Sequence, residues 1–396
     1  MTQYLALILA LIVGACELIA APPLFVVTNS KGAEEQATII SWNAGAKPVF
    51  RRLMDSKDSS FDFLYLKQQS TDVPRIPDEN LVWLENGDCL KFEKIRVVDD
   101  QLHLLCGSIR GEAAEQITIP ILELRMVWWR NPRRELSPAQ LRRQYLQKRL
   151  TKDQLVLANG EKVEGIFETL DQEKLDIDAG EIKSTLKTEQ LAFLVLGNEK
   201  PPGGKTMADS YRITTTAGDR ITLSKVRLKD AMLAGEMSSG NQVRMPIEKL
   251  AKVVNASSNV VSLLNHDFIS LEKNRWFSGA KTVVKPRISI GEEIFTSAGV
   301  VDDGLILDGN SELKIGRIGK YKSLVMTLGV DAASHAMVVP RLAFTSGGKT
   351  IHTPLEIDAN ENKTIFLELD RFQEIVITQQ AVPGVRVVIS DAFLIP

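Results

Sequence analysis

The chain has 396 residues, enough for two or three domains with sizeable hydrophobic cores. Its 44% hydrophobic and 25% charged residues argue against a wholly disordered protein. The net charge of -2 removes the general electrostatic argument for nucleic-acid binding, so we expect no nucleic-acid partner.

Residues 1–21 predict a signal peptide. An apolar run from Tyr4 to Val13 precedes small residues, and it is too short for a typical membrane span. We expect cleavage near Ala20 or Ala21 and export to the periplasm or the extracellular space. A buried first element is one alternative. Another is lipidation of Cys16, the last residue of the lipobox-like Val13–Cys16, and only then do we expect membrane anchoring.

Residues 22–75 predict short strands around the turn Ser30–Gly32. They resemble, in degenerate form, a repeat that follows over residues 76–131, 154–199 and 207–257. Each later copy has a strand and then a turn made of a small residue, Gly and an acid, in which Gly supplies positive φ. These turns are Asn86-Gly87-Asp88, Asn159-Gly160-Glu161 and Ala217-Gly218-Asp219.

The copies also share apolar positions. In each copy, one apolar residue follows the acid of the turn, a second lies in a later short strand, and a third lies in the last segment of the copy. About five strands in so few residues suit a small, strongly curved SH3-like or Sm-like barrel. The shared residues are Leu90, Val163 and Ile221; Leu102, Leu175 and Leu233; and Leu122, Leu191 and Leu250.

Residues 132–153 predict a basic connecting helix. Ser137, Pro138 and Gln140 form a capping-box pattern, and Leu141, Tyr145 and Leu146 form one apolar stripe. The helix can serve as a solvated connector or contact a polyanion, and the lack of interleaved aromatic residues favours the connector.

Cys89 and Cys106 could form a disulfide in an exported chain. A hairpin tip at Asp99-Asp100 would place Cys106 opposite Glu93, so two buried free thiols are favoured.

Residues 260–396 predict one longer β domain after the linkers at 198–206 and 255–259. Its central stretch, Gly304–Asp331, alternates apolar and polar residues between glycines, as half-buried strands do. We expect one buried face with Leu305, Leu307, Leu313 and Ile315, and another with Leu324, Met326 and Leu328.

This last third resembles the NPCBM family, the "novel putative carbohydrate-binding module". The landmarks are Gly304-Leu305, Gly319-Lys320-Tyr321, Leu328–Asp331, Gly347–Lys349 and Ser390–Leu394. The resemblance implies a jelly-roll, galactose-binding-like β-sandwich and a glycan partner. The layout of repeats before such a module is similar to that of exported proteins from planctomycete-type bacteria.

A sugar site usually needs an aromatic face and a few fixed polar groups. The candidate ligand-binding residues are Trp276 for stacking and Asp308, Asp331 and Lys349 for hydrogen bonds from rim loops. Trp276 can instead plug the end of the sandwich or pack against the third barrel. Asp331 with His335 can bind a cation or a hydroxyl group, but a loop hydrogen bond is favoured.

The acidic pairs Glu292-Glu293 and Asp302-Asp303 could cleave a glycosidic bond, although neighbouring Gly residues favour exposed turns. No nucleotide-binding or nucleophile motif occurs, and the histidines lack metal-ligand spacing. We therefore expect no catalytic residues, cofactor or metal.

Three functions follow from these patterns. The favoured one is an exported, non-catalytic protein whose C-terminal sandwich binds carbohydrate of the cell envelope or an extracellular polysaccharide, with envelope proteins as further partners. The second is an envelope scaffold that binds proteins and no sugar. The third, least favoured, is a glycoside hydrolase with a site between modules.

Overall fold

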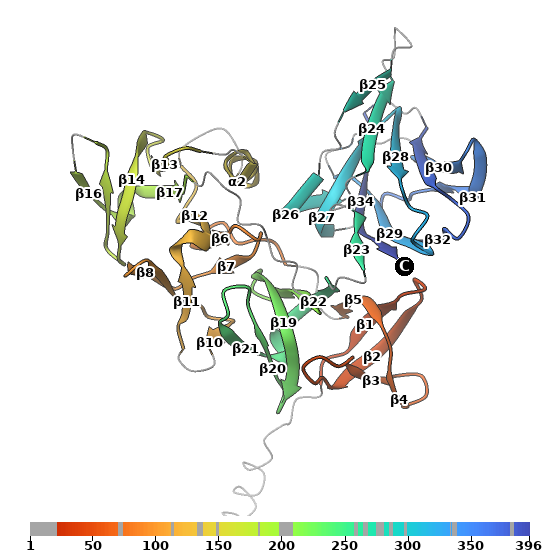
Figure 1. Cartoon of the computed structure of the whole chain (residues 1–396), viewed down its shortest axis with the longest axis horizontal. Coiled ribbons are helices and arrows are strands. Elements are labelled where there is room, and N and C mark those ends of the chain that lie inside the picture. The colour runs from red at the N-terminus through yellow and green to blue at the C-terminus, as the bar shows by residue number, and fades with distance from the viewer. Residues whose placement is uncertain are drawn as a thin grey trace, which may run out of the picture.

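The computed structural model of the chain consists almost wholly of β-strands, which confirms the predicted all-β fold class (Figure 1). Four small units precede a two-sheet sandwich. The predicted signal peptide with Cys16, the helix cap Ser137 and Trp276 lie outside the described residues. The structure describes residues 22–69, 74–111, 115–132, 138–147, 150–180, 183–197, 209–256, 260–263, 268–274, 281–284, 288–296, 299–332, 334, 339–380 and 384–396.

The first and second units occupy the N-terminal part of the chain. The first unit comprises β1 (Phe25–Asn29), β2 (Glu34–Ser41), β3 (Val49–Arg52), β4 (Asp58–Ser60) and β5 (Phe63–Gln68). The second unit comprises β6 (Leu81–Leu84), β7 (Cys89–Lys91), β8 (Lys94–Val98), β9 (Gln101–Leu105), β10 (Arg110–Gly111), β11 (Ile117–Pro120) and β12 (Leu124–Trp128).

The third and fourth units follow the helix α2 (Pro138–Gln147). The third unit comprises β13 (Asp153–Leu157), β14 (Lys162–Leu170), β15 (Lys174–Asp178), β16 (Lys183–Lys187) and β17 (Leu191–Val195). The fourth unit comprises β18 (Tyr211–Thr215), β19 (Arg220–Lys229), β20 (Met232–Glu236), β21 (Gln242–Pro246) and β22 (Leu250–Asn255).

The last strand of each unit pairs with the first strand of the same unit. Within the described ranges, it does not pair with the strand before it, so no unit is closed; in the second unit β7 and β8 are also not paired, and β12-β6-β7 and β8-β9-β11 are separate sheets. The predicted closed SH3-like or Sm-like barrels are therefore not seen among the described residues, and an SH3-like relationship of the units stays a prediction. In the last three units a 3-10 turn introduces the final strand: Ile121–Glu123, Thr188–Gln190 or Ile247–Lys249.

The turn glycines behave as their sequence pattern predicts. Gly87, Gly160 and Gly218 have φ of +87°, +91° and +92°, a region that side chains with a Cβ rarely adopt. The prediction for Leu122 is wrong, because this side chain lies in the 3-10 turn and is 77% exposed. Leu124, two residues later, begins the strand and is fully buried, as Leu191 and Leu250 are in their units.

The two cysteines of the second unit are buried and free. Asp99 and Asp100 form the hairpin tip with positive φ. The backbone N–H of Glu93 donates to Leu105 O at 2.7 Å, so Cys106 lies beside Glu93. The favoured interpretation of two buried thiols is therefore confirmed.

Helix α2 lies between the third unit and the sandwich, beside strand β26 (Figure 1). Leu141 and Tyr145 are buried in a cluster with the partly buried Leu146, which confirms the predicted stripe. Arg142 is also buried, and its guanidinium carbon lies 5.6 Å from the ring centroids of both Trp83 and Trp128. This basic side chain therefore packs inward and does not face a polyanion.

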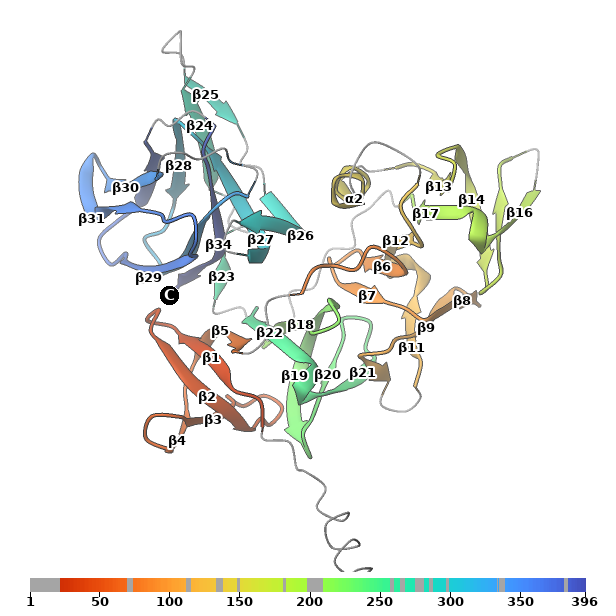
Figure 2. The ribbon, with the colours of Figure 1, turned by 180° about the vertical axis from the view of Figure 1, so that it is seen from behind.

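Equivalent strands of different units pair to join all four into one sheet network. The last strands pair between the first and fourth units (β5 with β22) and between the second and third units (β12 with β17). The second and fourth units meet through their second strands, where Cys89 faces Arg220. The spatial order is first, fourth, second, third, as a curved row (Figure 2).

The interface between the second and fourth units has pseudo-two-fold symmetry. Cys89 and Arg220 each follow the acid of their turn, and each acid bonds to the other unit. Asp88 accepts a hydrogen bond from the Thr222 hydroxyl at 2.8 Å. Asp219 accepts one from the Lys91 backbone N–H at 2.6 Å. Both carboxyl groups are fully buried, so these bonds compensate for their loss of water.

Asp88 makes the stability of this interface depend on pH. Burial raises the pKa of Asp88 above its ordinary value of 3.8, although hydrogen bonds from Thr222 and Asn86 and the charge of Arg212 act in the opposite direction. The folded state therefore holds this proton more tightly than the unfolded state. The stability contributed by Asp88 is then lost as pH rises from about 3.8 through the folded-state pKa.

We expect the Asp88→Asn variant to lack this loss. We expect the difference between the free energies of unfolding, wild type minus variant, to fall as pH rises from 3 to 7. The contributions of the other titrating groups are the same in both proteins and cancel in this difference. Urea titrations across this range measure it. A difference that stays constant or rises with pH would contradict the assignment.

The C-terminal sandwich has two sheets, in the orders β26-β27-β34-β29-β32 and β25-β24-β28-β33-β30-β31, with β23 paired to β34. Its strands are β23 (Val261–Ser262), β24 (Ile269–Asn274), β25 (Lys281–Val284), β26 (Ile288–Thr296), β27 (Gly299–Asp308), β28 (Ser311–Gly316), β29 (Ser323–Val330), β30 (Arg341–Ser346), β31 (Lys349–Glu356), β32 (Lys363–Glu368), β33 (Glu374–Gln379) and β34 (Arg386–Ile395).

All seven residues predicted to be buried in the central stretch are fully buried in one cluster, but their predicted grouping into faces is wrong, because β28, with Leu313 and Ile315, lies in the sheet opposite the one that holds β27 and β29. These residues are Leu305, Leu307, Leu313, Ile315, Leu324, Met326 and Leu328.

The sandwich stands on the first and fourth units (Figures 1 and 2). Lys252 Nζ lies 2.7 Å from Asp391 Oδ1, and the two side chains are only 5% and 12% exposed. The Tyr65 and Thr364 hydroxyl groups are 3.1 Å apart, and Leu64 packs in a cluster with Val325 of β29. Apolar burial and a buried ion pair thus fix the sandwich to the units. Among the described residues, no helix is long and apolar enough to cross a membrane.

Candidate functional site

One end of the sandwich brings together two of the predicted ligand-binding residues. Strand β27 ends at Asp308, β34 begins at Arg386 opposite it, and Asp331 directly follows β29 on the other side of β34. Antiparallel pairing therefore gathers these charged side chains at one end of the sandwich, which we call the rim.

The central pair of the rim is Asp331 and Arg386. Arg386 Nε lies 3.0 Å from Asp331 Oδ2, and their side chains are 33% and 10% exposed. The backbone N–H of Asp331 donates to Arg386 O at 3.0 Å, and that of Arg386 donates to the Ser334 hydroxyl at 2.9 Å. These backbone bonds hold the ion pair in place, while a third of the Arg386 side chain stays exposed.

Asp308 completes the rim beside the tight turn into β28. Its side chain is half-buried, and its carbonyl oxygen accepts a hydrogen bond from the Ser311 hydroxyl. Asn310 in this turn has φ of +65°. The Asp308 carboxyl group is thus placed by a constrained turn, next to the strand that carries Arg386.

The structure does not place Lys349 at the rim. Lys349 begins β31 at an exposed hairpin tip, opposite Ser346. Thr345 of the same hairpin pairs with Val376 of β33, so the hairpin tip lies toward Glu374, where β33 begins. The other end of β33 is at the rim, because the side-chain amide of Gln379 donates to Val385 O, next to Arg386. Lys349 therefore lies at the opposite end of the sandwich from Asp331, so the structure does not bring these two predicted residues together.

Trp276 and His335 lie outside the described residues, so their predicted roles stay predictions. The strand before Trp276, β24, places Lys273 opposite Ser311 in register. Asp331 makes its ion pair with Arg386, which the sequence had not indicated as a partner.

The acidic pairs lie in strands and not in the predicted turns. Glu293 of β26 pairs with Asp302 of β27. The neighbouring glycines had suggested turns, but Gly304 pairs with Ser289 in the ladder, and Gly291 lies in the interval between Ser289 and Glu293 where the register shifts. Among the described residues, no group of three or more His, Cys, Asp or Glu side chains could hold a metal ion.

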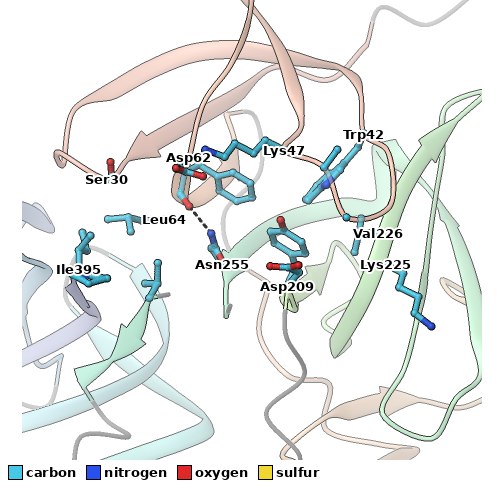
Figure 3. Close-up of a pocket in the computed structure, with 16 residues that line it drawn as sticks. Ser30, Trp42, Lys47, Asp62, Leu64, Asp209, Lys225, Val226, Asn255 and Ile395 are labelled. Atoms are coloured by element: carbon cyan, nitrogen blue, oxygen red, sulfur yellow. Dashed lines mark hydrogen bonds and ion pairs between the residues drawn. The ribbon is translucent and has the colours of Figure 1, made fainter. Parts of the chain in front are cut away.

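A cleft of about 510 Å³ lies where the first unit, the fourth unit and the end of the sandwich meet (Figure 3). None of its residues was among the sequence-predicted site residues. The lining residues are Ser30, Trp42, Gly45, Ala46, Lys47, Asp62, Phe63, Leu64, Asp209, Tyr211, Lys225, Val226, Asn255, Val260, Ile395 and Pro396.

One wall of the cleft is formed by the Tyr211 ring, which is backed by the buried rings of Phe63 and Trp42. Tyr211 is half-buried and nearly parallel to Phe63, with 5.8 Å between ring centroids, and it meets Trp42 edge-on at 4.7 Å. The backbone N–H of Leu228 donates to Trp42 O at 2.8 Å, which ties the first unit to the fourth at this wall. Mutual packing therefore fixes the Tyr211 ring.

Polar groups surround this wall. Lys47 Nζ lies 2.8 Å from Asp62 Oδ2, and both side chains are more than half exposed. The Asn255 side-chain amide donates to Phe63 O at 3.0 Å (Figure 3). Burial, followed by the charges of Asp209 and Asp62, raises the pKa of Tyr211. The phenol is therefore neutral near pH 7 and can both donate and accept a hydrogen bond.

No protein-family model matches the chain, and no curated protein matches it. Comparison with solved structures finds carbohydrate-binding modules. One is the CBM51 module of a Clostridium perfringens GH95 enzyme in complex with methyl-galactose. It has 13% identity and a TM-score of 0.26, and the match covers 34% of this chain and 99% of that chain.

A second similar structure holds CBM51-2 with GlcNAc and the INT domains of Clostridium perfringens ZmpB (13% identity, TM-score 0.26), and the match covers 44% of this chain and 38% of that one. A third is the tandem CBM51 modules of the family 98 glycoside hydrolase Sp3GH98 from Streptococcus pneumoniae SP3-BS71 (11% identity, TM-score 0.25), with coverage of 94% and 88%. At these TM-scores we draw no functional conclusion from the likeness.

Proposed function

We propose that this chain is an exported, non-catalytic protein whose C-terminal sandwich binds carbohydrate of the envelope or an extracellular polysaccharide at the rim. The observation that carries the proposal is the ion pair of Asp331 and Arg386, which backbone bonds fix while the Arg386 side chain stays 33% exposed. Export is supported by the signal-like residues 1–21.

The rim has the hydrogen-bonding chemistry that a sugar needs. A guanidinium group offers several N–H donors in a fixed plane, and the neighbouring carboxyl groups of Asp331 and Asp308 offer acceptors. Adjacent hydroxyl groups of a sugar ring can use both kinds of group at once. We propose that Trp276 supplies the apolar stacking face.

The test is calorimetric binding of the full chain to a panel of polysaccharides. We expect Arg386→Lys to weaken binding about 10-fold or more, because it keeps the charge but loses the planar set of donors, and one charged hydrogen bond contributes about 1.5–3 kcal/mol. Lys349→Ala is the control, since this exposed cation lies at the other end of the sandwich. A folded Arg386→Lys variant that binds as the wild type does would reject the rim.

An envelope scaffold without sugar binding is the second candidate. It is favoured by the strand pairing that joins all four units and by the buried ion pair that docks the sandwich. A folded full chain that binds no polysaccharide on a broad panel supports this candidate. Release of reducing sugar from any polysaccharide would contradict the non-catalytic assignment.

A further inference from the structure

We infer that the three-part cleft of Figure 3 is a second saccharide site, which takes a neutral sugar of one or two rings and is separate from the rim. The inference takes its ligand class from the proposed function but not its location. The cleft volume of about 510 Å³ falls within the range of about 300–1,000 Å³ for small-molecule pockets.

The wall and the mouth of the cleft offer complementary surfaces. The half-buried Tyr211 ring presents an apolar surface held by Phe63 and Trp42, and its hydroxyl group adds a donor and an acceptor. The Lys47–Asp62 pair adds donors and acceptors that solvent still reaches. A sugar ring, with apolar C–H faces and a hydroxyl edge, fits this combination.

Charge at the cleft favours a neutral ligand. Lys47 is balanced by Asp62 at 2.8 Å, and Lys225 by Glu236 at 2.8 Å. Figure 3 shows the Lys225 side chain directed away from Asp62 and Asn255. An anionic ligand would have to break one of these pairs, whereas hydroxyl groups can bond to them as they stand, and because Asp209 also lines the cleft, a cation is the competing ligand that must be tested.

The two sites lie at opposite ends of one strand. Arg386 at the rim begins β34, and Ile395 at the cleft ends it nine residues later. At about 3.3 Å per residue, the sites are on the order of 30 Å apart. One chain could therefore hold two segments of a polysaccharide, and occupancy of both sites would raise its apparent affinity.

The experiment is calorimetry of the full chain with galactose, N-acetylglucosamine, glucose and cellobiose, with spermidine as a cationic probe. We expect at least one sugar to bind at the cleft, with affinity lowered about 10-fold or more by Tyr211→Phe and by Asp62→Asn. Tyr211→Phe keeps the aromatic packing and removes only the hydroxyl group, and Asp62 is exposed, so both variants should fold.

The rim variant Arg386→Lys separates the two proposals. Cleft binding that persists in Arg386→Lys and is lost in Tyr211→Phe supports the inference, whatever happens at the rim. Sugar binding that is unchanged in both cleft variants would overturn the inference while leaving the rim proposal intact. Binding of spermidine and of no sugar in Arg386→Lys would assign the cleft to amines and also overturn it.

Discussion

Replacement of Asp219 by Ala should lower the free energy of unfolding of the strand-paired units by about 3–5 kcal/mol. The fully buried carboxyl group accepts hydrogen bonds from the Lys91 backbone N–H, the Ser108 hydroxyl and the Thr215 hydroxyl. Its removal leaves these three donors without an acceptor inside the interface between the second and fourth units. Urea titration followed by tryptophan fluorescence measures the change, because four of the five tryptophans lie in the units.

Glu161→Ala is the matched control for Asp219→Ala. Glu161 holds the same position of the repeat turn in the third unit, but its side chain is exposed. We expect its replacement to change the free energy of unfolding by no more than about 0.5 kcal/mol. Equal effects of the two substitutions would show that the turn, and not the interface, gives the acid its role.

Replacement of Lys252 by Ala should detach the sandwich from the four units. The change removes the cation that lies 2.7 Å from the nearly buried carboxyl group of Asp391. Removal of one partner of a buried ion pair lowers the free energy of unfolding by about 3–5 kcal/mol. It also removes the ammonium group that lies 5.7 Å from the centroid of the Tyr65 ring. We expect calorimetric unfolding to separate into one transition for the sandwich and one for the units.

The double variant Lys252→Met with Asp391→Asn tests the cause. It removes both charges while keeping similar volumes, and Asn tolerates the positive φ of 45° at position 391. We therefore expect it to recover most of the lost stability and a single transition. A double variant as unstable as Lys252→Ala would show that packing, and not an uncompensated charge, dominates the interface. Lys183→Ala, at an exposed ion pair, should leave the unfolding profile unchanged.

Features fixed by local physics could be predicted from the sequence. Period-two alternation placed Leu305 and Leu313 in the core, and glycine at a short turn predicted the positive φ of Gly87. The stripe of α2 followed from the spacing of Leu141 and Tyr145. Each of these depends on residues close together in the chain.

Features that depend on strand order could not be predicted. Asp219 and Glu161 occupy the same turn position, yet only Asp219 meets another unit. Lys349 and Asp331 both lie at ends of strands of the sandwich, but the register places them at opposite ends of the domain. The cleft joins Asp62 to Tyr211 across nearly 150 residues, and no local pattern marks such a meeting.

The most direct test of the central claim is calorimetric binding of the full chain to a polysaccharide panel, with the wild type compared with Arg386→Lys, Trp276→Ala and Lys349→Ala. We expect saturable binding that Arg386→Lys weakens about 10-fold or more. We also expect Trp276→Ala to abolish rim binding without unfolding and Lys349→Ala to have no effect. A folded wild type that binds no polysaccharide, or rim variants that bind as the wild type does, would contradict carbohydrate binding by the sandwich.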